Sequence, residues 1–173
     1  MSNYRRLLMK GGTYFFTVVT YNRRPLLCEE YALNRLKAAF GYVKKSHPYQ
    51  MEALVVLPDH LHCIWRLPED DADFATRWNR FKRYFSIGIQ GSLNQRREKS
   101  IWQHRFWERL IRNDADLHRR LDYIHYNPVK HGYVKNPYDW PYSTFKHHVK
   151  QGHYDMNWGA LGEPEDIKKM LLE

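Results

Sequence analysis

Residues 57–65 read Leu57-Pro58-Asp59-His60-Leu61-His62-Cys63-Ile64-Trp65, in the middle of a run rich in apolar residues. Apolar residues flank the Pro-Asp pair on both sides, so the pattern predicts two buried strands joined by a tight turn. Side chains alternate between the two faces of a strand. His60 and His62 should therefore lie on the same face, where they could present two nitrogen atoms to one ion.

A third metal ligand has to come from another part of the chain, because two imidazoles alone make a weak site for a divalent ion. The best candidate lies in the stretch Leu121-Asp122-Tyr123-Ile124-His125-Tyr126-Asn127-Pro128-Val129-Lys130-His131-Gly132. Tyr123 and Asn127 are four residues apart, so on a helix they share a face. An ion held by His60, His62 and Asn127 would then lie close to the Tyr123 phenol.

Each of these residues also has an ordinary structural interpretation. The chain contains 10 histidines and 13 tyrosines, so a His-x-His pair or one helical tyrosine is weak evidence by itself. Asn127 precedes Pro128 and could be the N-cap of a short helical turn that ends at Gly132. His125 and Tyr126 are near neighbours, but a helix turns them away from the face of Tyr123.

Three longer strings make the pattern more specific. They are Val-Val-Leu-Pro-Asp-His-Leu-His-Cys-Ile-Trp (55–65), Ile-Trp-Gln-His-Arg-Phe-Trp-Glu (101–108) and Asp-Tyr-Ile-His-Tyr-Asn-Pro-Val-Lys-His-Gly (122–132). These strings, and the N-terminal segment 4–17, resemble the REP-associated tyrosine transposases, a branch of the single-tyrosine HUH endonucleases. The resemblance covers about residues 1–150. We therefore divide the chain into a transposase domain, residues 1–150, and an acidic tail, residues 151–173.

The resemblance implies an enzyme that nicks and rejoins single-stranded DNA. The phenolate of Tyr123 would attack a phosphodiester, a 3′-OH would leave, and the 5′-phosphate would remain esterified to the tyrosine. A free tyrosine has a pKa of about 10, so nearby cations or a base must assist it. His60, His62 and Asn127 form a nitrogen and oxygen ligand set that permits Mg²⁺ or Mn²⁺, the metals that the resemblance favours.

The substrates that the resemblance implies are single-stranded hairpins of repetitive extragenic palindromic (REP) elements. Aromatic residues interleaved with Arg and Lys suit single-strand binding by base stacking and phosphate contact. We take five residues as candidate DNA contacts: Arg5, Arg6, Trp102, Arg105 and Lys130. Two further arginines, Arg23 and Arg24, follow the first strand, where they are either solvated charges or DNA contacts.

Positive charge is concentrated in the middle of the chain. The formal charge is +9, and residues 73–120 contain 12 basic and 5 acidic residues, a net +7. This excess indicates a polyanionic partner. Within this region Arg77, Arg80 and Arg83 are expected beside the site, and a loop at 91–100 could grip a phosphate backbone. The tail, with five acidic and two basic residues, is expected to fold over the basic cleft and compete with DNA.

Hydrophobic periodicity predicts four strands and three main helices. The strands are expected at 13–21, at 51–57, at 60–67 and in the second half of 101–111. One helix spans 29–45, a second places Phe74, Trp78, Phe81 and Phe85 on one core-facing stripe, and a third begins at the cap residue Asn113. A short helix is expected within 145–149. The order of the first six elements matches the ferredoxin-like βαββαβ split fold, an α+β class with an antiparallel sheet, followed by the tyrosine helix and a C-terminal extension.

Other features limit the compartment and the class of protein. The two cysteines, Cys28 and Cys63, form no Cys-x-x-Cys motif, which argues against a disulfide framework or a zinc knuckle. The longest apolar run near the N-terminus, residues 14–19, is too short for a signal peptide, and nothing approaches the roughly 20 apolar residues of a membrane span. We therefore expect a cytoplasmic protein, and the C-terminal extension favours a monomer.

Two other classes of function stay open at this point. The same scaffold could serve a non-catalytic regulatory protein that binds hairpin DNA. An RRM-like RNA binder would have a similar layer order, but the chain lacks an RNP-type Gly-Phe-aromatic string on a strand.

Overall fold

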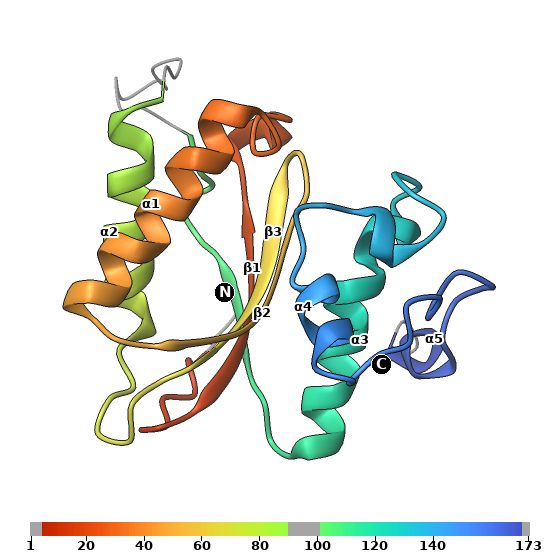
Figure 1. Cartoon of the computed structure of the whole chain (residues 1–173). Helices are drawn as coiled ribbons and strands as arrows, with labels where there is room; N and C mark the ends of the chain where they lie inside the picture. Colours follow the sequence, from red (N-terminus) through yellow and green to blue (C-terminus); the bar gives the residue numbers. More distant parts are fainter. Residues whose placement is uncertain (1–4, 90–100, 171–173) are drawn as a thin grey trace.

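The computed structural model describes residues 5–89 and 101–170 (Figure 1). The loop at 91–100, in which Arg96, Arg97 and Lys99 were expected to contact DNA, lies outside the described residues.

Four antiparallel strands form one sheet in the order β2-β3-β1-β4. The strands are β1 (Thr13–Val19), β2 (Gln50–Val56), β3 (His60–Arg66) and β4 (Trp107–Leu110). Helix α1 (Glu30–Ser46) connects β1 to β2, and α2 (Phe74–Ile87) connects β3 to β4. This is the connectivity of the split βαββαβ fold. The predicted α+β fold with an antiparallel sheet is confirmed.

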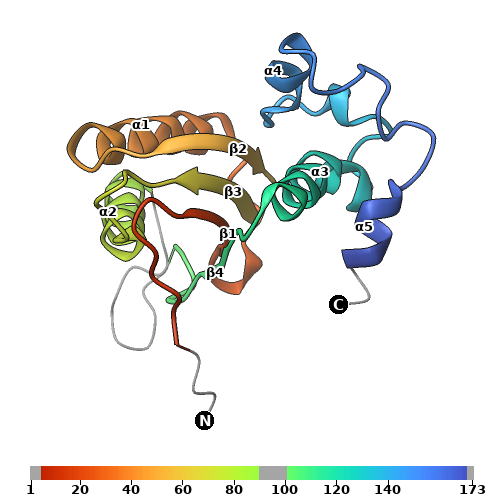
Figure 2. The same ribbon diagram turned by 90° about the horizontal axis from the view of Figure 1, so that it is seen from below.

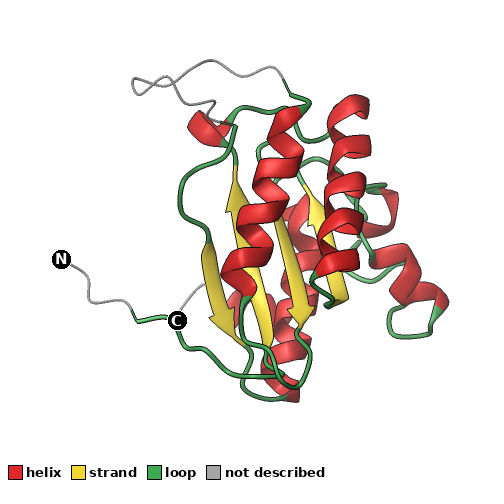
Figure 3. Cartoon of the chain, turned by 90° about the vertical axis from the view of Figure 1, so that its left-hand side faces the viewer, coloured by secondary structure: helices red, strands yellow, loops and turns green. Residues whose placement is uncertain are grey.

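Helices cover both faces of the sheet. Figures 2 and 3 show α1 and α2 packed together on one face, whereas α3 (Asp114–Lys130) covers the other. The alternation of side chains along β1 explains these two layers, because Tyr14 and Phe16 belong to the core under α1 and α2 while Phe15 belongs to the core under α3. Large rings fill the first core, where Trp65 and Trp78 stack at 4.2 Å.

Helix α3 begins with the cap that its sequence predicts. The Asn113 side chain accepts a hydrogen bond of 2.8 Å from the backbone N–H of Asp116. Acidic residues in the first turn add a favourable interaction with the helix dipole. The helix continues through Pro128 to Lys130, and the backbone carbonyl of Asn127 accepts a bond from His131. The alternative in which Asn127 caps a separate short turn is therefore wrong.

The prediction that the arginines of α2 lie beside the site is also wrong. Helix α2 lies on the face of the sheet opposite α3 (Figure 2). Arg77 is 1% exposed, and its guanidinium donates hydrogen bonds to the carboxylate of Asp71 and to the carbonyls of His47 and Pro48. Helical periodicity showed which side of α2 is apolar, but it did not show which face of the sheet that side would cover.

The chain after α3 forms short elements. They are the 3₁₀ turn η2 (Pro137–Asp139), the predicted helix α4 (Phe145–Lys150) and a further helix α5 (Glu165–Met170), while another 3₁₀ turn, η1 (Tyr21–Arg23), follows β1. The segment before α4 pairs with the edge of β2, where the N–H of Val56 donates to the carbonyl of Tyr142 and the N–H of Thr144 donates to that of Leu54. Among the described residues, none of the helices has the length and apolar character needed to span a membrane.

Candidate active site

A pocket of about 520 Å³ lies between the sheet and α3. It contains both histidines of the His-x-His pair together with the tyrosine of α3. The residues that line it are Phe15, Thr17, Val19, Arg23, His60, His62, Trp107, Arg120, Tyr123, Lys130, His131 and Met170. The structure thus brings together residues that are sixty positions apart in the sequence.

Strand register places the two histidines on the α3 side of the sheet. His62 is paired with Thr17 of β1, and His60 is paired with Val19. The two imidazole rings lie 4.9 Å apart between centroids, and the ring of Tyr123 lies 5.3 Å from that of His62. Leu61 and Cys63 point into the opposite core, as the alternation predicts.

Neighbouring residues orient both imidazoles. His60 Nδ1 donates a hydrogen bond of 2.6 Å to the carboxylate of Asp59, and His62 Nδ1 lies 2.8 Å from the hydroxyl of Thr17. These contacts leave the Nε2 atom of each ring for another partner. His62 Nε2 is buried and has no hydrogen-bond partner among the described residues. Histidines that bind metals are typically held through their other ring nitrogen in this way.

The protonation states favour cation binding. Burial lowers the pKa of His60, although the bond to Asp59 partly opposes this effect. Burial also lowers the pKa of His62 well below its usual value, and the proximity of His60, His131 and Lys130, which disfavours a further positive charge, adds to the shift. Burial alone would raise the pKa of Asp59, but hydrogen bonds from His60 and Arg23 bring it below the ordinary value. Neutral imidazoles are the form that binds a metal.

Asn127 lies one helical turn after Tyr123 and is fully buried. Its Oδ1 and Nδ2 atoms have no hydrogen-bond partner within the described part of the chain. In residues 5–89 and 101–170, no three His, Cys, Asp or Glu side chains are grouped so that they could hold a metal. A metal at the histidine pair would therefore need a ligand of another type. The amide oxygen of Asn127 is a donor of that type, but Asn127 is not among the residues that line the pocket.

A lysine lies against the ring of Tyr123, and a third histidine lies beside His60. The Nζ atom of Lys130 lies 4.9 Å from the centroid of the Tyr123 ring, and the His131 ring lies 5.3 Å from that of His60. Lys130 was expected as a DNA contact, whereas His131 was not selected. Lys130 and His131 follow Tyr123 by seven and eight residues, so the helical repeat places both near the face of Tyr123. That spacing could have identified His131.

Arg23 lines the pocket from a segment with an unusual backbone conformation. Asn22 and Arg23 have φ angles of 52° and 50°, a left-handed conformation that residues other than glycine rarely adopt. The Arg23 guanidinium donates a hydrogen bond of 3.1 Å to the Asp59 carboxylate. Asp59 therefore connects an exposed cation to His60. Strained backbone of this kind is frequent at functional sites.

The other candidate DNA contacts lie outside the pocket. Trp102 is 7% exposed and packs against Phe81 and Phe85 in the core under α2. Arg6 forms an ion pair with Glu108 at 3.4 Å. Arg5 and Arg105 are exposed and do not line the pocket.

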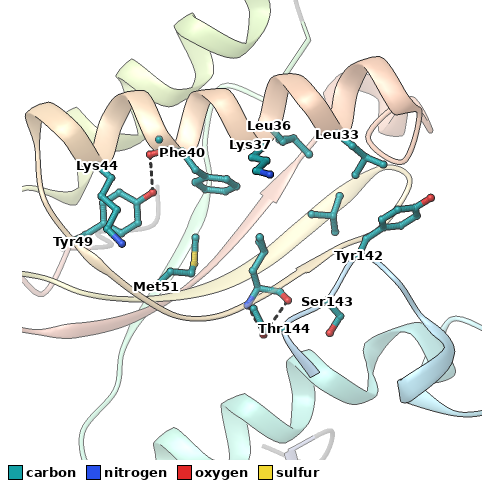
Figure 4. Close-up of a pocket in the computed structure, with 13 residues that line it drawn as sticks. Leu33, Leu36, Lys37, Phe40, Lys44, Tyr49, Met51, Tyr142, Ser143 and Thr144 are labelled. Atoms are coloured by element: carbon teal, nitrogen blue, oxygen red, sulfur yellow. Dashed lines mark hydrogen bonds between the residues drawn. The ribbon is translucent and has the colours of Figure 1, made fainter. Parts of the chain in front are cut away.

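A second pocket, of about 420 Å³, lies between α1 and β2 (Figure 4). Its lining is mainly apolar, with Phe40, Met51 and Leu54 among its members, and Lys37 and Lys44 extend from α1. It lies on the face of the sheet opposite the two histidines. Of these two pockets, the first combines the tyrosine of α3 with imidazole and cationic side chains, and the second contains no histidine.

Comparison with known proteins adds a family match. Residues 9–127 match the family model described as "Transposase IS200 like". A REP-associated tyrosine transposase of Escherichia coli (strain K12) is 48% identical over 163 residues, which cover 92% of each chain. A relative from Haemophilus influenzae is 44% identical over 172 residues and covers 95% of this chain and 96% of its own. The solved structure of a REP-associated tyrosine transposase bound to a REP hairpin superposes with a TM-score of 0.81, at 48% identity and 91% coverage of both chains.

Proposed function

The chain belongs to the REP-associated tyrosine transposases of the IS200-like family, DNA-cleaving enzymes, and on this premise we propose that it cuts and rejoins single-stranded DNA at REP hairpins through Tyr123. The observation that supports this proposal most strongly is the position of Tyr123. Its half-buried ring lies 5.3 Å from His62, in a pocket that also contains Lys130, Arg23 and Arg120. The positive charges of this pocket favour binding of a polyanion, and the Tyr123 phenol would be the nucleophile.

In the proposed reaction, the phenolic oxygen of Tyr123 forms a bond to the scissile phosphorus while the bond from phosphorus to the 3′ oxygen breaks. The phenol loses a proton and the leaving 3′ oxygen gains one. Because one phosphodiester replaces another, no energy source is consumed. Rejoining is the reverse attack by a 3′-OH on the phosphotyrosine. Lys130, beside the Tyr123 ring, would stabilise the negative charge that develops on the oxygens in the transition state.

A divalent metal, when bound, would polarise the non-bridging oxygens of the phosphate. His60, His62 and Asn127 would hold it, and we propose Mg²⁺ or Mn²⁺ because oxygen ligands from Asn127, water and phosphate suit both ions. Asp59 and Thr17 would hold the two imidazoles through Nδ1, which leaves Nε2 of each ring for the metal.

Single-stranded hairpins of REP elements are the proposed ligands. Their support is the solved relative, which was determined bound to a REP hairpin and shares 48% of its sequence with this chain. Lys130 is the proposed contact nearest the scissile phosphate, and Arg5 and Arg105 remain proposed contacts to DNA outside the pocket. Arg6 and Trp102 are less suited to this role because they are engaged within the protein. The site draws all its residues from one chain, which supports a monomeric enzyme acting on chromosomal DNA in the cytoplasm.

A denaturing gel with single-stranded REP hairpins and Mg²⁺ or Mn²⁺ tests the proposal. The wild type should give a shortened strand and a slower, protein-linked band, and Tyr123→Phe should give neither while still binding the hairpin. Tyr126→Phe is the matched control, because its ring lies near Trp158 rather than His62, and it should cleave normally. Binding without cleavage by the wild type under either metal would instead favour the regulatory hairpin-binding protein.

A further inference from the structure

Trp107 is the first residue of β4, an edge strand of the sheet. It is 49% exposed, whereas Trp65, Trp78 and Trp102 are at most 7% exposed. Its exposed surface lies in the lining of the active-site pocket. An aromatic side chain that is half exposed loses part of the hydrophobic stabilisation that burial would give. The packing of the described residues does not explain why Trp107 is exposed.

Strand register fixes the direction of the indole. Trp107 is paired with Thr17 of β1, and Thr17 is paired with His62 of β3. Directly opposite residues of antiparallel strands project from the same face. The three side chains therefore form a row across the α3 side of the sheet. Since neighbouring strands are about 4.8 Å apart, the backbone of Trp107 is about 10 Å from that of His62.

One buried ring connects Trp107 to the nucleophile. Phe15 meets the Trp107 ring edge-on at 5.8 Å and the Tyr123 ring edge-on at 5.9 Å. The Arg120 guanidinium lies 5.5 Å from the Phe15 centroid, and its Nε atom is 3.6 Å from the carboxylate of Asp116. Trp107 and Arg120 line the same pocket. Proteins bind unpaired nucleotides by combining an accessible aromatic plane, which stacks on the base, with a cation, which contacts the phosphate.

We propose that Trp107 is a stacking platform for one unpaired base of the DNA strand near the scissile phosphodiester. The inference deepens the proposed function and rests on it for the identity of the ligand. The strand would cross the sheet from the histidine pair towards β4, with Arg120 beside its backbone. Stacking tolerates any base, so this subsite supplies affinity and positions the phosphodiester at Tyr123 without reading sequence.

The test uses REP hairpins in which 2-aminopurine replaces one unpaired base at a time, on either side of the scissile bond. Stacking on an aromatic ring quenches 2-aminopurine fluorescence. In the uncleaving Tyr123→Phe protein, one position should be quenched on binding. That quenching should disappear in Tyr123→Phe/Trp107→Ala, return with Trp107→Phe, and be accompanied in the alanine protein by a loss of affinity of about 5- to 150-fold.

Tyr31→Ala is the matched control, because Tyr31 is an aromatic residue of α1 with 55% exposure that does not line the pocket. It should change neither quenching nor affinity. If quenching persists in the Trp107→Ala protein, the proposal that Trp107 is a stacking platform is wrong. The proposed function is unaffected in that case if the wild type still forms the covalent product. If quenching depends on Trp107 but the wild-type protein never cleaves the hairpin, the stacking platform is supported and the proposed cleavage activity is contradicted.

Discussion

At the scale of the residue, the two histidines depend on different neighbours. Asp59 precedes His60 and binds it from the same turn, whereas Thr17 reaches His62 across the β1–β3 pairing. Each contact engages Nδ1 and so leaves Nε2 available to another ligand. Partners of this kind set the ring orientation and raise the basicity of metal-binding histidines.

Removing one of these partners should weaken metal binding without removing a ligand. We expect Asp59→Ala to lower the affinity for Mn²⁺ by about 10- to 100-fold, measured by calorimetry on the DNA-free protein. Asp70→Ala is the control, since Asp70 is exposed and outside the pocket. Equal affinities in the two variants would show that Asp59 does not position His60.

Lys130 lies against the ring of Tyr123 and should act on the chemical step more than on binding. We expect Lys130→Met to slow single-turnover cleavage by about 100-fold, because a fixed cation stabilises charge that develops in the transition state. Lys130→Arg should restore part of the rate. Lys135→Met, at another exposed lysine, should cleave at the normal rate. A variant that loses hairpin affinity but keeps its rate at saturation would assign Lys130 to binding alone.

The residues that local spacing places together were predictable, and those that tertiary pairing places together were not. His60 and His62 share a face because strands alternate, and both line the pocket with Tyr123. Asn127, expected on the face of Tyr123, is buried and does not line the pocket. Thr17 and Trp107 reach the pocket only through the register of β1 with β3 and β4. Trp102 appeared equally suited to DNA in the sequence, yet it packs under α2. One exposed and one buried tryptophan cannot be distinguished by residue type.

At the scale of the element, the four strands, α1 and the start of α3 were predicted to within about two residues, because each carries its own apolar period or cap signal. The face of the sheet that α2 covers was not predicted, because it depends on the path of the connections between α2 and the strands β3 and β4. Helix α5, with six residues, was not predicted either. Helices this short are stable only through tertiary contacts, which sequence periodicity does not reveal.

The contact between α4 and β2 should make the fold sensitive to acid. Burial lowers the pKa of His148, whose Nε2 donates to the Glu52 carbonyl, and the nearby imidazoles of His147 and His153 lower it further. The unfolded chain, with a histidine pKa of about 6.5, therefore binds more protons than the folded protein, so the free energy of unfolding decreases as the pH falls below about 6.5. Urea unfolding from about pH 8 to about pH 5 measures this slope.

His148→Gln should reduce the pH dependence of the free energy of unfolding, because one titrating group is gone while a side-chain donor remains. The slope that persists belongs to His62 and His125, whose pKa values burial lowers more strongly. His147→Gln changes an exposed neighbour on the same helix and should keep most of the slope. If both variants retain the wild-type slope, the acid sensitivity arises elsewhere in the molecule.

At the scale of the whole molecule, the C-terminal helix α5 lies next to the active-site pocket. Helix α5 packs beside α3 (Figures 1 and 2), and its last residue, Met170, lines the pocket with Tyr123 and the histidines. Glu165 and Asp166 lie in the first turn of the same helix. Lys168 and Lys169 lie in its last turn, next to Met170. The proposal that residues 151–173 compete with DNA therefore rests on the acidic excess of the tail as a whole, five acidic against two basic residues.

Loss of the tail charges should then increase DNA affinity. A chain that ends at Gly162 should bind REP hairpins about two- to five-fold more tightly than the full chain, as expected for a few exposed charges. The variant Glu165→Gln/Asp166→Asn keeps the packing of α5 and should show part of the gain, with the difference decreasing at high salt. Unchanged affinity of both proteins for the hairpin, measured by fluorescence anisotropy, would contradict competition by the tail.

The central claim is that Tyr123 becomes covalently linked to DNA, and mass spectrometry of the trapped product tests it most directly. Tryptic digestion should release residues 121–130 as one peptide, which contains Tyr123 and Tyr126. After reaction of the wild type with a REP hairpin and Mn²⁺, followed by nuclease digestion, fragmentation should place the phosphonucleotide on Tyr123. A nucleotide on Tyr126 or on another peptide, or cleaved DNA with no adduct at any time, would contradict the assignment of the nucleophile.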